Sequence, residues 1–407
     1  MLILGKCMSL TKRNFLKAVS CAYFFYSFKA LTKDNQPIGN YIPAKDKNTW
    51  PSKVHRVEEF YTSTDSDYSD AIAKGINYCS LNNGALLFSD KYKISRSIIL
   101  PDNTYIMGKE GSLLYCDADK PISIFSATSK KNINIKGLSV DGGVTEKTGK
   151  NYTRLVRFIK CVDITINSFK ACNSADWCIS FEACKMIRLE NIIVSGGGHL
   201  KPGGRDGIHF LDCSYFYIDR ADITSGDDCI GITTQYGNSY YGSINNVIGS
   251  SEIGSIVACN EEQKKDKTYY ASKIGFINIT NVSVKNNGTA RNIVRFFAYN
   301  ALSNISNIKL SRVNGMSNSY GVYIGGVTNL TLNGINVSSL NKHAIYLVKS
   351  KNIQAQNVAY GLSRVVGYYG VSIFNCENVS GLFKSHNFNG DKKILITKSK
   401  VVKLTDN

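Results

Sequence analysis

Three aspartates at two matching points of the sequence are the residues best suited to chemistry. Asp227 and Asp228 are adjacent in the segment ITSGDDCIGI, and Asp206 opens the segment DGIHF, 22 residues before Asp228 opens DCIGI. Adjacent carboxylates repel each other unless water, a cation or a proton relieves the repulsion. Such a pair alone is equally compatible with a solvated turn at the start of a strand, so its surroundings must decide.

A cluster of three carboxylates suits two kinds of chemistry. In inverting glycoside hydrolysis one carboxyl group is protonated to assist the leaving oxygen and another is charged to activate water, with roughly 6.5–9.5 Å between them. Crowding of like charges can itself raise one pKa and so create the acid. Three aspartates can also bind Ca²⁺, which prefers hard oxygen ligands. The sequence alone leaves both uses open.

A repeat of about 22 residues predicts how these aspartates are positioned. The pattern Asn-aliphatic-x-aliphatic recurs at Asn132, Asn307, Asn329 and Asn352. A unit this short cannot bury its own apolar face, but like units stacked in register bury a continuous one. The fixed framework of leucine-rich repeats is missing, and propeller blades are about twice as long. We therefore predict an all-β fold, a single-stranded right-handed parallel β-helix.

Overlaying DGIHF on DCIGI places the aspartates on neighbouring coils. Asp206 then lies beside Asp228, and adjacent strands are roughly 4.8 Å apart, so all three carboxylates are expected at one rim. Alternation along the strand points Ile208 and Phe210 inward and His209 outward, which makes His209 a candidate substrate contact near Asp206. The same overlay stacks apolar residues on each other, namely Ile208 on Ile230 and Phe210 on Ile232.

The repeat defines a catalytic β-helix domain at residues 66–385, with flanking regions of different character. Residues 36–65 are expected to form an extended lead-in, and residues 386–407 a polar C-terminal tail. An amphipathic segment near the start of the domain predicts a helix with its N-cap at Ser66 or Asp67, which would cap the exposed end of the stack. Its apolar face consists of Tyr68, Ala71, Ile72, Ile76 and Cys79.

Residues 1–35 resemble an export leader. The pair Lys12–Arg13 precedes a short apolar stretch, as in a twin-arginine leader with lysine in place of the first arginine. The apolar stretch is too short to span a bilayer. We therefore expect an exported protein, periplasmic or extracellular, without a stable membrane span.

The charge balance indicates an anionic partner. The chain has 49 Lys and Arg against 31 Asp and Glu, a formal net charge of +18, which concentrates polyanions near the surface. Nucleic acid is disfavoured because no basic helix or finger motif occurs. An acidic polysaccharide is the partner we expect, and the oligomeric state is not indicated. The 12 cysteines contain no CxxC pair, so no zinc or redox motif is expected. We expect neither a cofactor nor a bound metal.

The segment GRDGIHFLDCSYFYIDRADITSGDDCIGI, residues 204–232, resembles the core of glycoside hydrolase family 28, the polygalacturonases. That family folds as a right-handed β-helix and carries an Asn-Thr-Asp motif followed about one coil later by Gly-Asp-Asp-Cys. Here Asp206 matches the first aspartate, with Arg205 in place of threonine. The resemblance implies that Asp227 is the general acid and that Asp206 and Asp228 hold and activate water.

Two departures from the family pattern bear on activity and substrate. The family's Gly-His-Gly motif has no histidine here, and we align that position with Gly249. In the segment IVRFFAY, Arg295 matches the family's Arg-Ile-Lys motif, but Phe297 replaces the lysine. An arginine suits forked recognition of a carboxylate, and an aromatic ring suits stacking on a sugar. We therefore expect an acidic or mixed polysaccharide, bound by Arg205, His209, Arg295 and Phe297.

Two other functions remain open. A polysaccharide lyase on the same fold would use calcium and a Lys or Arg base, and would release an unsaturated sugar that absorbs in the ultraviolet. A non-catalytic glycan-binding or matrix protein would keep the fold and lose the acid. The missing histidine and lysine leave room for both.

Overall fold

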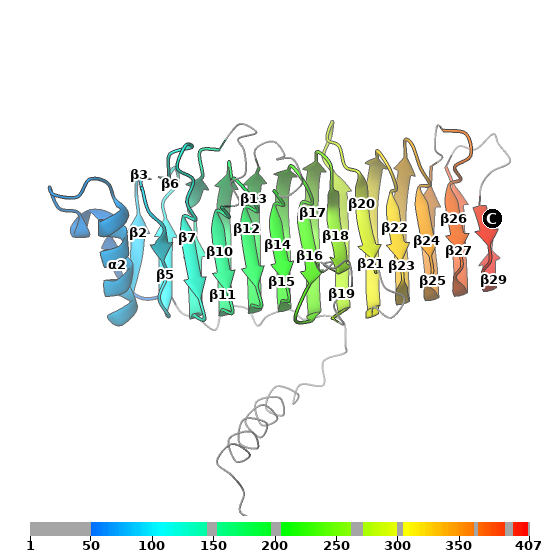
Figure 1. Cartoon of the computed structure of the whole chain (residues 1–407), viewed down its shortest axis with the longest axis horizontal. Coiled ribbons are helices and arrows are strands. Elements are labelled where there is room, and N and C mark those ends of the chain that lie inside the picture. Colours follow the sequence, from blue (N-terminus) through cyan, green and yellow to red (C-terminus); the bar gives the residue numbers. More distant parts are fainter. Residues whose placement is uncertain are drawn as a thin grey trace, which may run out of the picture. The chain divides into compact units, whose positions relative to one another are not determined.

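The chain winds into successive coils whose strands form two parallel sheets (Figure 1). The computed structural model describes residues 50–144, 153–196, 205–261, 272–298, 304–361, 365–386 and 394–405. Within these ranges one sheet has 17 strands and the other has 12. The predicted export leader at residues 1–35 lies outside the described residues.

The 17-stranded sheet contains most of the long strands. Its members are β1 (Lys53–Arg56), β2 (Gly84–Phe88), β3 (Lys91–Lys93), β5 (Thr104–Gly108), β6 (Leu113–Tyr115), β8 (Lys131–Lys136), β9 (Ser139–Asp141), β11 (Val162–Cys172), β13 (Lys185–Ser195), β15 (Ser214–Ser225), β17 (Ser239–Ser251), β19 (Lys273–Val284), β21 (Asn304–Ser317), β23 (Val327–Ser339), β25 (Lys351–Tyr360), β27 (Glu377–Ser385) and β29 (Lys400–Thr405).

The 12-stranded sheet is built from shorter strands, and it carries the predicted site. Its members are β4 (Ile98–Ile99), β7 (Phe125–Thr128), β10 (Val156–Ile159), β12 (Ile179–Glu182), β14 (Ile208–Leu211), β16 (Ile230–Thr234), β18 (Ser255–Glu261), β20 (Asn292–Phe297), β22 (Val322–Gly325), β24 (Ile345–Val348), β26 (Val371–Phe374) and β28 (Ile394–Thr397).

Neighbouring coils stack in register. Ile208 pairs with Ile230, and Phe210 pairs with Ile232, as the overlay of the two aspartate segments predicts. The pairings along both sheets are parallel. The protein is therefore an all-β, right-handed parallel β-helix, and the predicted fold class is confirmed.

Asparagine fixes one corner of the coils. Asn307, Asn329, Asn352 and Asn378 have φ values of 55–61°, the left-handed region that asparagine tolerates better than most residues. Their side-chain amides also form a ladder: Asn329 donates to Asn307 at 3.1 Å, Asn352 to Asn329 at 3.0 Å, and Asn378 to Asn352 at 3.0 Å. The repeated asparagine thus marks a corner, and the aliphatic residues after it face inward.

Between the sheets, like residues stack into ladders. Phe158, Phe181 and Phe210 are fully buried, with successive ring centroids 5.7 and 5.3 Å apart. Burial of a large apolar side chain stabilises the fold by about 1.5–3 kcal/mol. Because one coil cannot bury these rings alone, each coil depends on the next. Cys184 and Cys213 lie in the same core as free thiols, so they act as small apolar residues.

Helix α2 (Ser69–Leu81) covers the first coil, as predicted (Figure 1). The N-cap is Tyr68 and not the predicted Ser66 or Asp67, because the Asp67 carboxylate instead accepts a hydrogen bond from the Ser69 N–H at 2.7 Å, inside the first turn. The predicted apolar face is buried at Ala71, Ile72, Ile76 and Cys79.

Both flanking regions contain regular structure that we did not predict. In the lead-in, β1 pairs with β2, and the 3-10 helix η1 (Val57–Phe60) lies against α2. In the segment expected as a polar tail, β28 pairs with β26 and β29 pairs with β27, so the stack continues past residue 385. Lysines alternate with the half-buried Val402 and Leu404 of β29, so the segment has a polar composition and its strand was not predicted.

Among the described residues, no helix has the length and apolar character needed to cross a membrane.

Replacing Asn352 tests the asparagine corner. Asn352→Ala is expected to lower the free energy of unfolding by about 1–3 kcal/mol, because alanine is strained at this φ and two amide hydrogen bonds are lost. Asn352→Gly loses the same bonds but tolerates the backbone conformation, so it should lose less. Denaturant unfolding measures both variants, and equal losses would show that the corner does not depend on backbone conformation.

Candidate active site

Two rows of side chains run across successive coils on the outer face of the 12-stranded sheet. The first, which we call the outer row, follows the strand pairings from His209 to Gly231, Ala258 and Arg295. The second, the rim row, lies three positions earlier in each coil, from Asp206 to Asp228, Ser255 and Asn292. Three strand spacings, about 14 Å at roughly 4.8 Å each, therefore separate the coils of His209 and Arg295.

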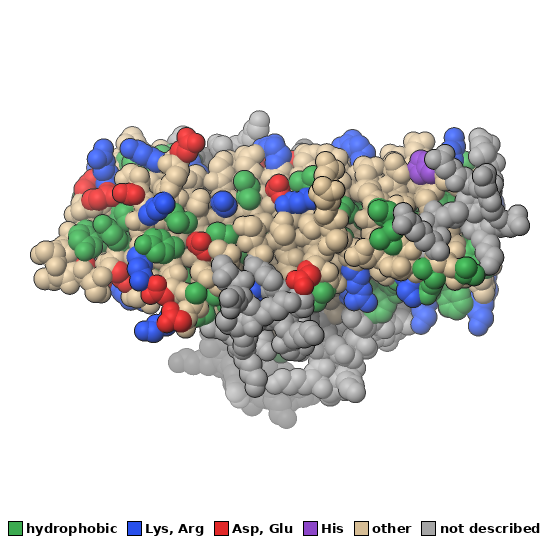
Figure 2. Space-filling model, turned by 90° about the horizontal axis from the view of Figure 1, so that it is seen from above, with side chains coloured by type: hydrophobic (Ala, Val, Ile, Leu, Met, Phe, Trp, Pro, Cys, Tyr) green, Lys and Arg blue, Asp and Glu red, His purple; other side chains and the backbone are tan. Residues whose placement is uncertain are grey.

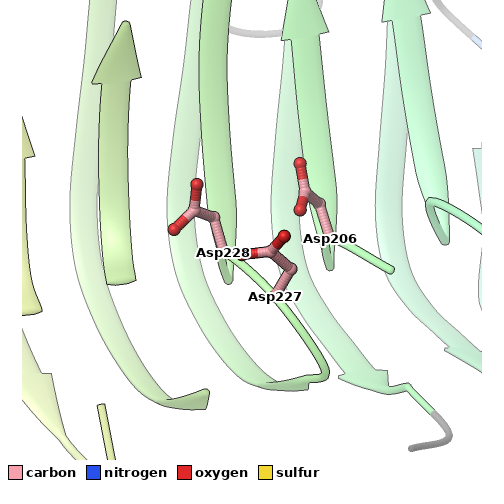
Figure 3. A group of neighbouring side chains, drawn as sticks. All are labelled: Asp206, Asp227 and Asp228. Atoms are coloured by element: carbon pink, nitrogen blue, oxygen red, sulfur yellow. The ribbon is translucent and has the colours of Figure 1, made fainter. Parts of the chain in front are cut away.

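The carboxylate cluster consists of Asp206, Asp227 and Asp228 (Figure 3). Asp206 and Asp228 lie just before β14 and β16, and Asp227 lies on the segment leading into β16. One carboxylate oxygen of each residue lies within 4.8 Å of the corresponding oxygens of the other two. The structure therefore brings together the three aspartates that the coil overlay places at one rim.

Backbone contacts hold Asp227 and Asp228 in place. The Ser255 N–H, from the next coil, donates to Asp228 Oδ1 at 2.6 Å. The backbone carbonyl of Asp227 accepts hydrogen bonds from the hydroxyls of Ser225 at 2.6 Å and Ser251 at 2.7 Å. A side chain at Gly254 would bring a Cβ atom within 2.5 Å of the Asp227–Asp228 peptide, so this position requires glycine.

Histidine and tryptophan hold Asp206. His209 Nδ1 lies 2.5 Å from Asp206 Oδ2, and its Nε2 lies 2.8 Å from Thr233 Oγ1. Trp177 stacks on the imidazole with ring centroids 3.5 Å apart and an interplanar angle of 3°. His209 points away from the core as predicted, but its side chain is only 3% exposed. This burial favours a role in positioning Asp206 over direct contact with a substrate. A Cβ at Gly231 would lie 2.7 Å from His209 Nδ1.

The electrostatic environment places a proton in the cluster. Burial, together with the charges of Asp206 and Asp227, raises the pKa of Asp228 to about 8. The Ser255 N–H and Arg295 oppose this by stabilising the charged carboxylate. Crowding therefore raises one aspartate pKa, as expected from the sequence. The residue affected is Asp228, whereas the family resemblance implies Asp227 as the acid.

A polar pocket of about 440 Å³ lies on the N-terminal side of the cluster. The guanidinium of Arg154 stacks on Trp177 at 3.7 Å, which connects the pocket to His209 through a continuous stack. Arg154 also pairs with Asp176 at 3.4 Å, and burial raises the pKa of Asp176 despite that pairing. The pocket is lined by Ser123, Thr153, Arg154, Arg157 and Asp176.

The other predicted substrate contacts lie at different depths. Arg295 is half-buried in the outer row, with its guanidinium carbon 5.9 Å from the ring centroid of the half-buried Phe297. Arg205 is 2% exposed, and its backbone carbonyl accepts a hydrogen bond from the Asp227 N–H at 3.3 Å. Its burial favours a role in positioning Asp227. For all four predicted contacts, substrate binding stays a prediction.

The alignment of Gly249 with the family histidine does not fit the coil register. Gly249 lies on β17 of the 17-stranded sheet, where an added Cβ would lie 3.0 Å from Cys229 Sγ, in the core. The residue that follows Asp228 in the rim row is Ser255. Gly249 lies about one average coil after Asp228, but the coil that joins Ile230 to its partner Val257 is 27 residues long, so a position chosen by average spacing falls short of β18.

Several residues of the site were not identified from the sequence. Extending the coil overlay by one coil on each side would have found Trp177 and Ser255, because each lies two positions before an inward-facing residue that pairs with Ile208 or Ile230. No sequence signal distinguishes Thr233, Gly231 and Gly254 from ordinary strand and turn residues, because their roles depend on contacts across coils.

Basic side chains are dispersed, and not clustered, on the face of the molecule drawn in Figure 2. Figure 2 shows Lys and Arg side chains dispersed over one face, with acidic side chains among them. This agrees with the scattered lysines of the sequence. Local recognition of an anion must therefore depend on individual arginines such as Arg157 and Arg295.

The chain matches the glycosyl hydrolases family 28 over residues 108–387, and it belongs to that family. It is 22% identical over 291 residues to the probable rhamnogalacturonase A of Aspergillus oryzae, which covers 68% of this chain and 57% of the relative. It is 29% identical over 108 residues to polygalacturonase-2 of Solanum lycopersicum, covering 26% and 23% of the two chains. The chain thus spans less than two thirds of either relative.

Solved structures share the fold at low sequence identity. A family 28 exopolygalacturonase from Yersinia enterocolitica matches with a TM-score of 0.53 and 12% identity, over 86% of this chain and 78% of that one. The A-module of a mannuronan C-5 epimerase from Azotobacter vinelandii matches with a TM-score of 0.55 and 12% identity, over 86% and 97%. These two names describe different reactions, so the shared fold does not identify the reaction.

Replacing Asp228 with asparagine is expected to stabilise the protein in a pH-dependent way. Because the pKa of about 8 lies above that of an unfolded aspartate, the folded state binds the proton more tightly, and the free energy of unfolding falls as pH rises from about 4 to 8. Asp228→Asn removes this loss, so its gain should be roughly 0.5–2 kcal/mol at pH 8 and close to zero at pH 4.

Denaturant unfolding at the two pH values measures this gain. The matched control is Asp222→Asn, which changes an exposed aspartate that pairs with Lys285 on the other sheet. A gain for Asp228→Asn that is the same at both pH values would contradict the raised pKa.

Proposed function

We propose that this protein is an inverting glycoside hydrolase that cleaves a pectin-like polysaccharide containing both acidic and uncharged sugars. Asp227 donates a proton to the leaving oxygen, while Asp206 and Asp228 hold and activate the attacking water. The observation that carries this proposal is the carboxylate cluster, whose oxygens lie within 4.8 Å of one another on the outer face of the β-helix. Family membership supports the same class of reaction.

The cluster has the dimensions to hold one water molecule. A point at the centre of a triangle with sides of 4.8 Å lies about 2.8 Å from each corner, which is an ordinary hydrogen-bond distance. His209 fixes Asp206 and the Ser255 N–H fixes Asp228, as is suitable for two residues that orient a water. The nearest oxygens are closer than the roughly 6.5–9.5 Å typical between carboxyl groups of inverting enzymes, and retaining enzymes have about 5–5.5 Å. The anomeric form of the product therefore decides the stereochemistry.

The raised pKa of Asp228 supplies the proton that the reaction needs. At neutral pH the cluster keeps one proton, which lies on Asp228 in the free protein. Because the carboxylate oxygens lie within 4.8 Å of one another, a water held between them can relay this proton to Asp227. Asp227 then protonates the leaving oxygen, and the charged Asp206 and Asp228 accept the proton of the attacking water.

The arginines on the outer face support an acidic substrate. Arg157 lines the N-terminal pocket and Arg295 lies in the outer row, so arginines flank the cluster on both sides. Phe297 presents a ring where the family pattern has a lysine, which reduces the positive charge near Arg295. One relative is named a rhamnogalacturonase, and a backbone of alternating rhamnose and galacturonate would combine uncharged and acidic sugars. We propose that backbone as the substrate class.

Replacing Asp227 with asparagine tests the assignment of the acid. Asp227→Asn is nearly isosteric, so the fold should be kept while kcat on rhamnogalacturonan falls by about 10²–10⁴-fold, the usual contribution of a general acid. Reducing-end release measures the rate, and Asp212→Asn, which lies on a turn outside the cluster, is the control. Retention of turnover by Asp227→Asn would contradict the assignment.

The same assay separates the alternative functions. A hydrolase should keep its activity in chelator, form no product that absorbs in the ultraviolet, and give product of inverted configuration by NMR. Loss of activity in chelator together with ultraviolet-absorbing product would support a calcium-dependent lyase. The three close carboxylate oxygens are also suitable ligands for calcium. Binding without cleavage would support a glycan-binding protein.

We further propose that residues 1–35 direct export to the periplasm or beyond, where a polysaccharide substrate would be met. The Lys12–Arg13 pair and the apolar stretch after it support this. Fractionation of cells expressing the full chain should find the protein outside the cytoplasm. Replacing Lys12 and Arg13 together with glutamine should retain it inside, and an unchanged distribution would contradict the proposal.

A further inference from the structure

Beyond Arg295, aromatic residues continue both rows of the site. In the outer row, Arg295 pairs with Tyr323, which pairs in turn with Tyr346. In the rim row, the backbone N–H of Tyr320 donates to the Asn292 side chain at 3.3 Å, and His343 lies in the following coil. The coils that continue from the carboxylates therefore carry rings at the corresponding positions.

These rings contact one another and form a continuous surface. We define the aromatic strip as Phe297, Tyr320, Tyr323, His343, Tyr346 and Tyr368, all of which are half-buried. Tyr320 and Tyr346 stack with centroids 5.3 Å apart and planes at 16°. Tyr323 lies 5.7 Å from Phe297 and 5.5 Å from Tyr346.

The strand geometry makes these rings face outward. Val322 and Ile324 flank Tyr323 and are fully buried, so alternation sends the tyrosine to the outer face. A Cβ added at Gly325 would lie 3.1 Å from both the Phe297 and Tyr323 rings, so the glycine leaves room for both rings to lie over the sheet.

The aromatic strip carries little charge. Burial lowers the pKa of His343 and raises the pKa of Tyr320, so both side chains are neutral near pH 7. Lys342 borders the strip, but its ammonium group lies 4.5 Å above the Tyr368 ring and hydrogen-bonds the Tyr368 hydroxyl. This contrasts with the N-terminal pocket, whose lining includes the charged residues Arg154, Arg157 and Asp176, with Glu182 paired to both arginines.

We propose that the aromatic strip binds uncharged sugar residues of the same polysaccharide chain that the carboxylate cluster cuts. This deepens the proposed function, on which it rests. A pyranose ring has a C–H face that packs on an aromatic ring, whereas the negative face of the ring repels a nearby carboxylate. The continuity of the two rows means that a chain lying over Asp228 and Arg295 reaches Tyr323 and Tyr346 next.

The strip and the N-terminal pocket therefore distinguish two sides of the cleavage point. Arg295 beside the cluster and the partly exposed Arg157 on the N-terminal side favour acidic sugars, whereas the rings beyond Arg295 favour uncharged ones. A polymer of uronate alone would place carboxylates over the rings. A mixed chain avoids this, and the strip thus selects for mixed substrates.

Direct binding tests this inference without requiring cleavage. In an Asp227→Asn background, calorimetry would measure binding of rhamnogalacturonan and of polygalacturonate. Adding Tyr323→Ala and Tyr346→Ala should weaken rhamnogalacturonan binding roughly 5- to 50-fold, as expected for the loss of two stacking contacts, and change polygalacturonate binding less. The matched control is Tyr217→Ala, which removes a half-buried strand tyrosine from the other sheet.

Two further double variants distinguish a loss of sugar binding from a loss of folding. Tyr323→Phe with Tyr346→Phe keeps both rings and should bind like the parent, and the Leu pair keeps apolar volume without a π face and should bind like the Ala pair. Unchanged rhamnogalacturonan affinity in the Ala and Leu pairs would overturn the inference. An equal loss on polygalacturonate, or no binding of either polymer by the parent, would also overturn it. Binding that depends on the two tyrosines without any cleavage by the unmutated protein would support the strip and refute the hydrolase instead.

Discussion

In-register stacking of short coils is the constraint on which the rest of this structure depends. A single coil of about 22 residues cannot bury an apolar face, so Ile208 must meet Ile230, and Phe210 must meet Ile232, for either coil to be stable. The same register fixes the residues two positions earlier. Asp206 and Asp228 are brought together because the apolar residues beside them have no other stable partner.

Stacking forces like charges together, and the protein manages the repulsion locally. Burial and the neighbouring charges raise the pKa of Asp228 to about 8, so a proton replaces one negative charge at neutral pH. The His209 imidazole and the Ser255 N–H hold the remaining oxygens. Keeping the three carboxylates together costs free energy that separating them would recover, and this cost is confined to one site. Such unfavourable crowding is common where a carboxylic acid acts in catalysis.

The sequence predicts the fold and the carboxylate cluster because both follow from a repeat that is visible in one dimension. The overlay that stacks Ile208 on Ile230 also places Asp206 beside Asp228, and the asparagine at each corner is readable because it occupies the left-handed region. Contacts that cross coils without a repeated residue type are not readable in this way. The stack of Arg154, Trp177 and His209 joins three different coils, and the three different residue types form no repeat that would show that their side chains stack.

Spacing also misleads where coils differ in length. A spacing of about one coil after Asp228 leads to Gly249, but Ile230 and its partner Val257 are 27 residues apart, against 22 for Ile208 and Ile230, so Ser255 takes the position next to Asp228. The last coil was missed because lysines interleave with Val402 and Leu404. Both errors arise because the register is set by inward-facing residues and not by chain length.

Titration of the aspartate carboxyl groups by carbon-13 NMR tests the central claim most directly. If the stacked coils crowd the three carboxylates, one aspartate in the free protein should titrate near pH 8, and Asp206→Asn should lower that pKa because one neighbouring charge is removed. If every aspartate titrates near pH 4, and Asp206→Asn leaves the remaining titrations unchanged, the carboxylates do not share a proton and the account of the site is wrong.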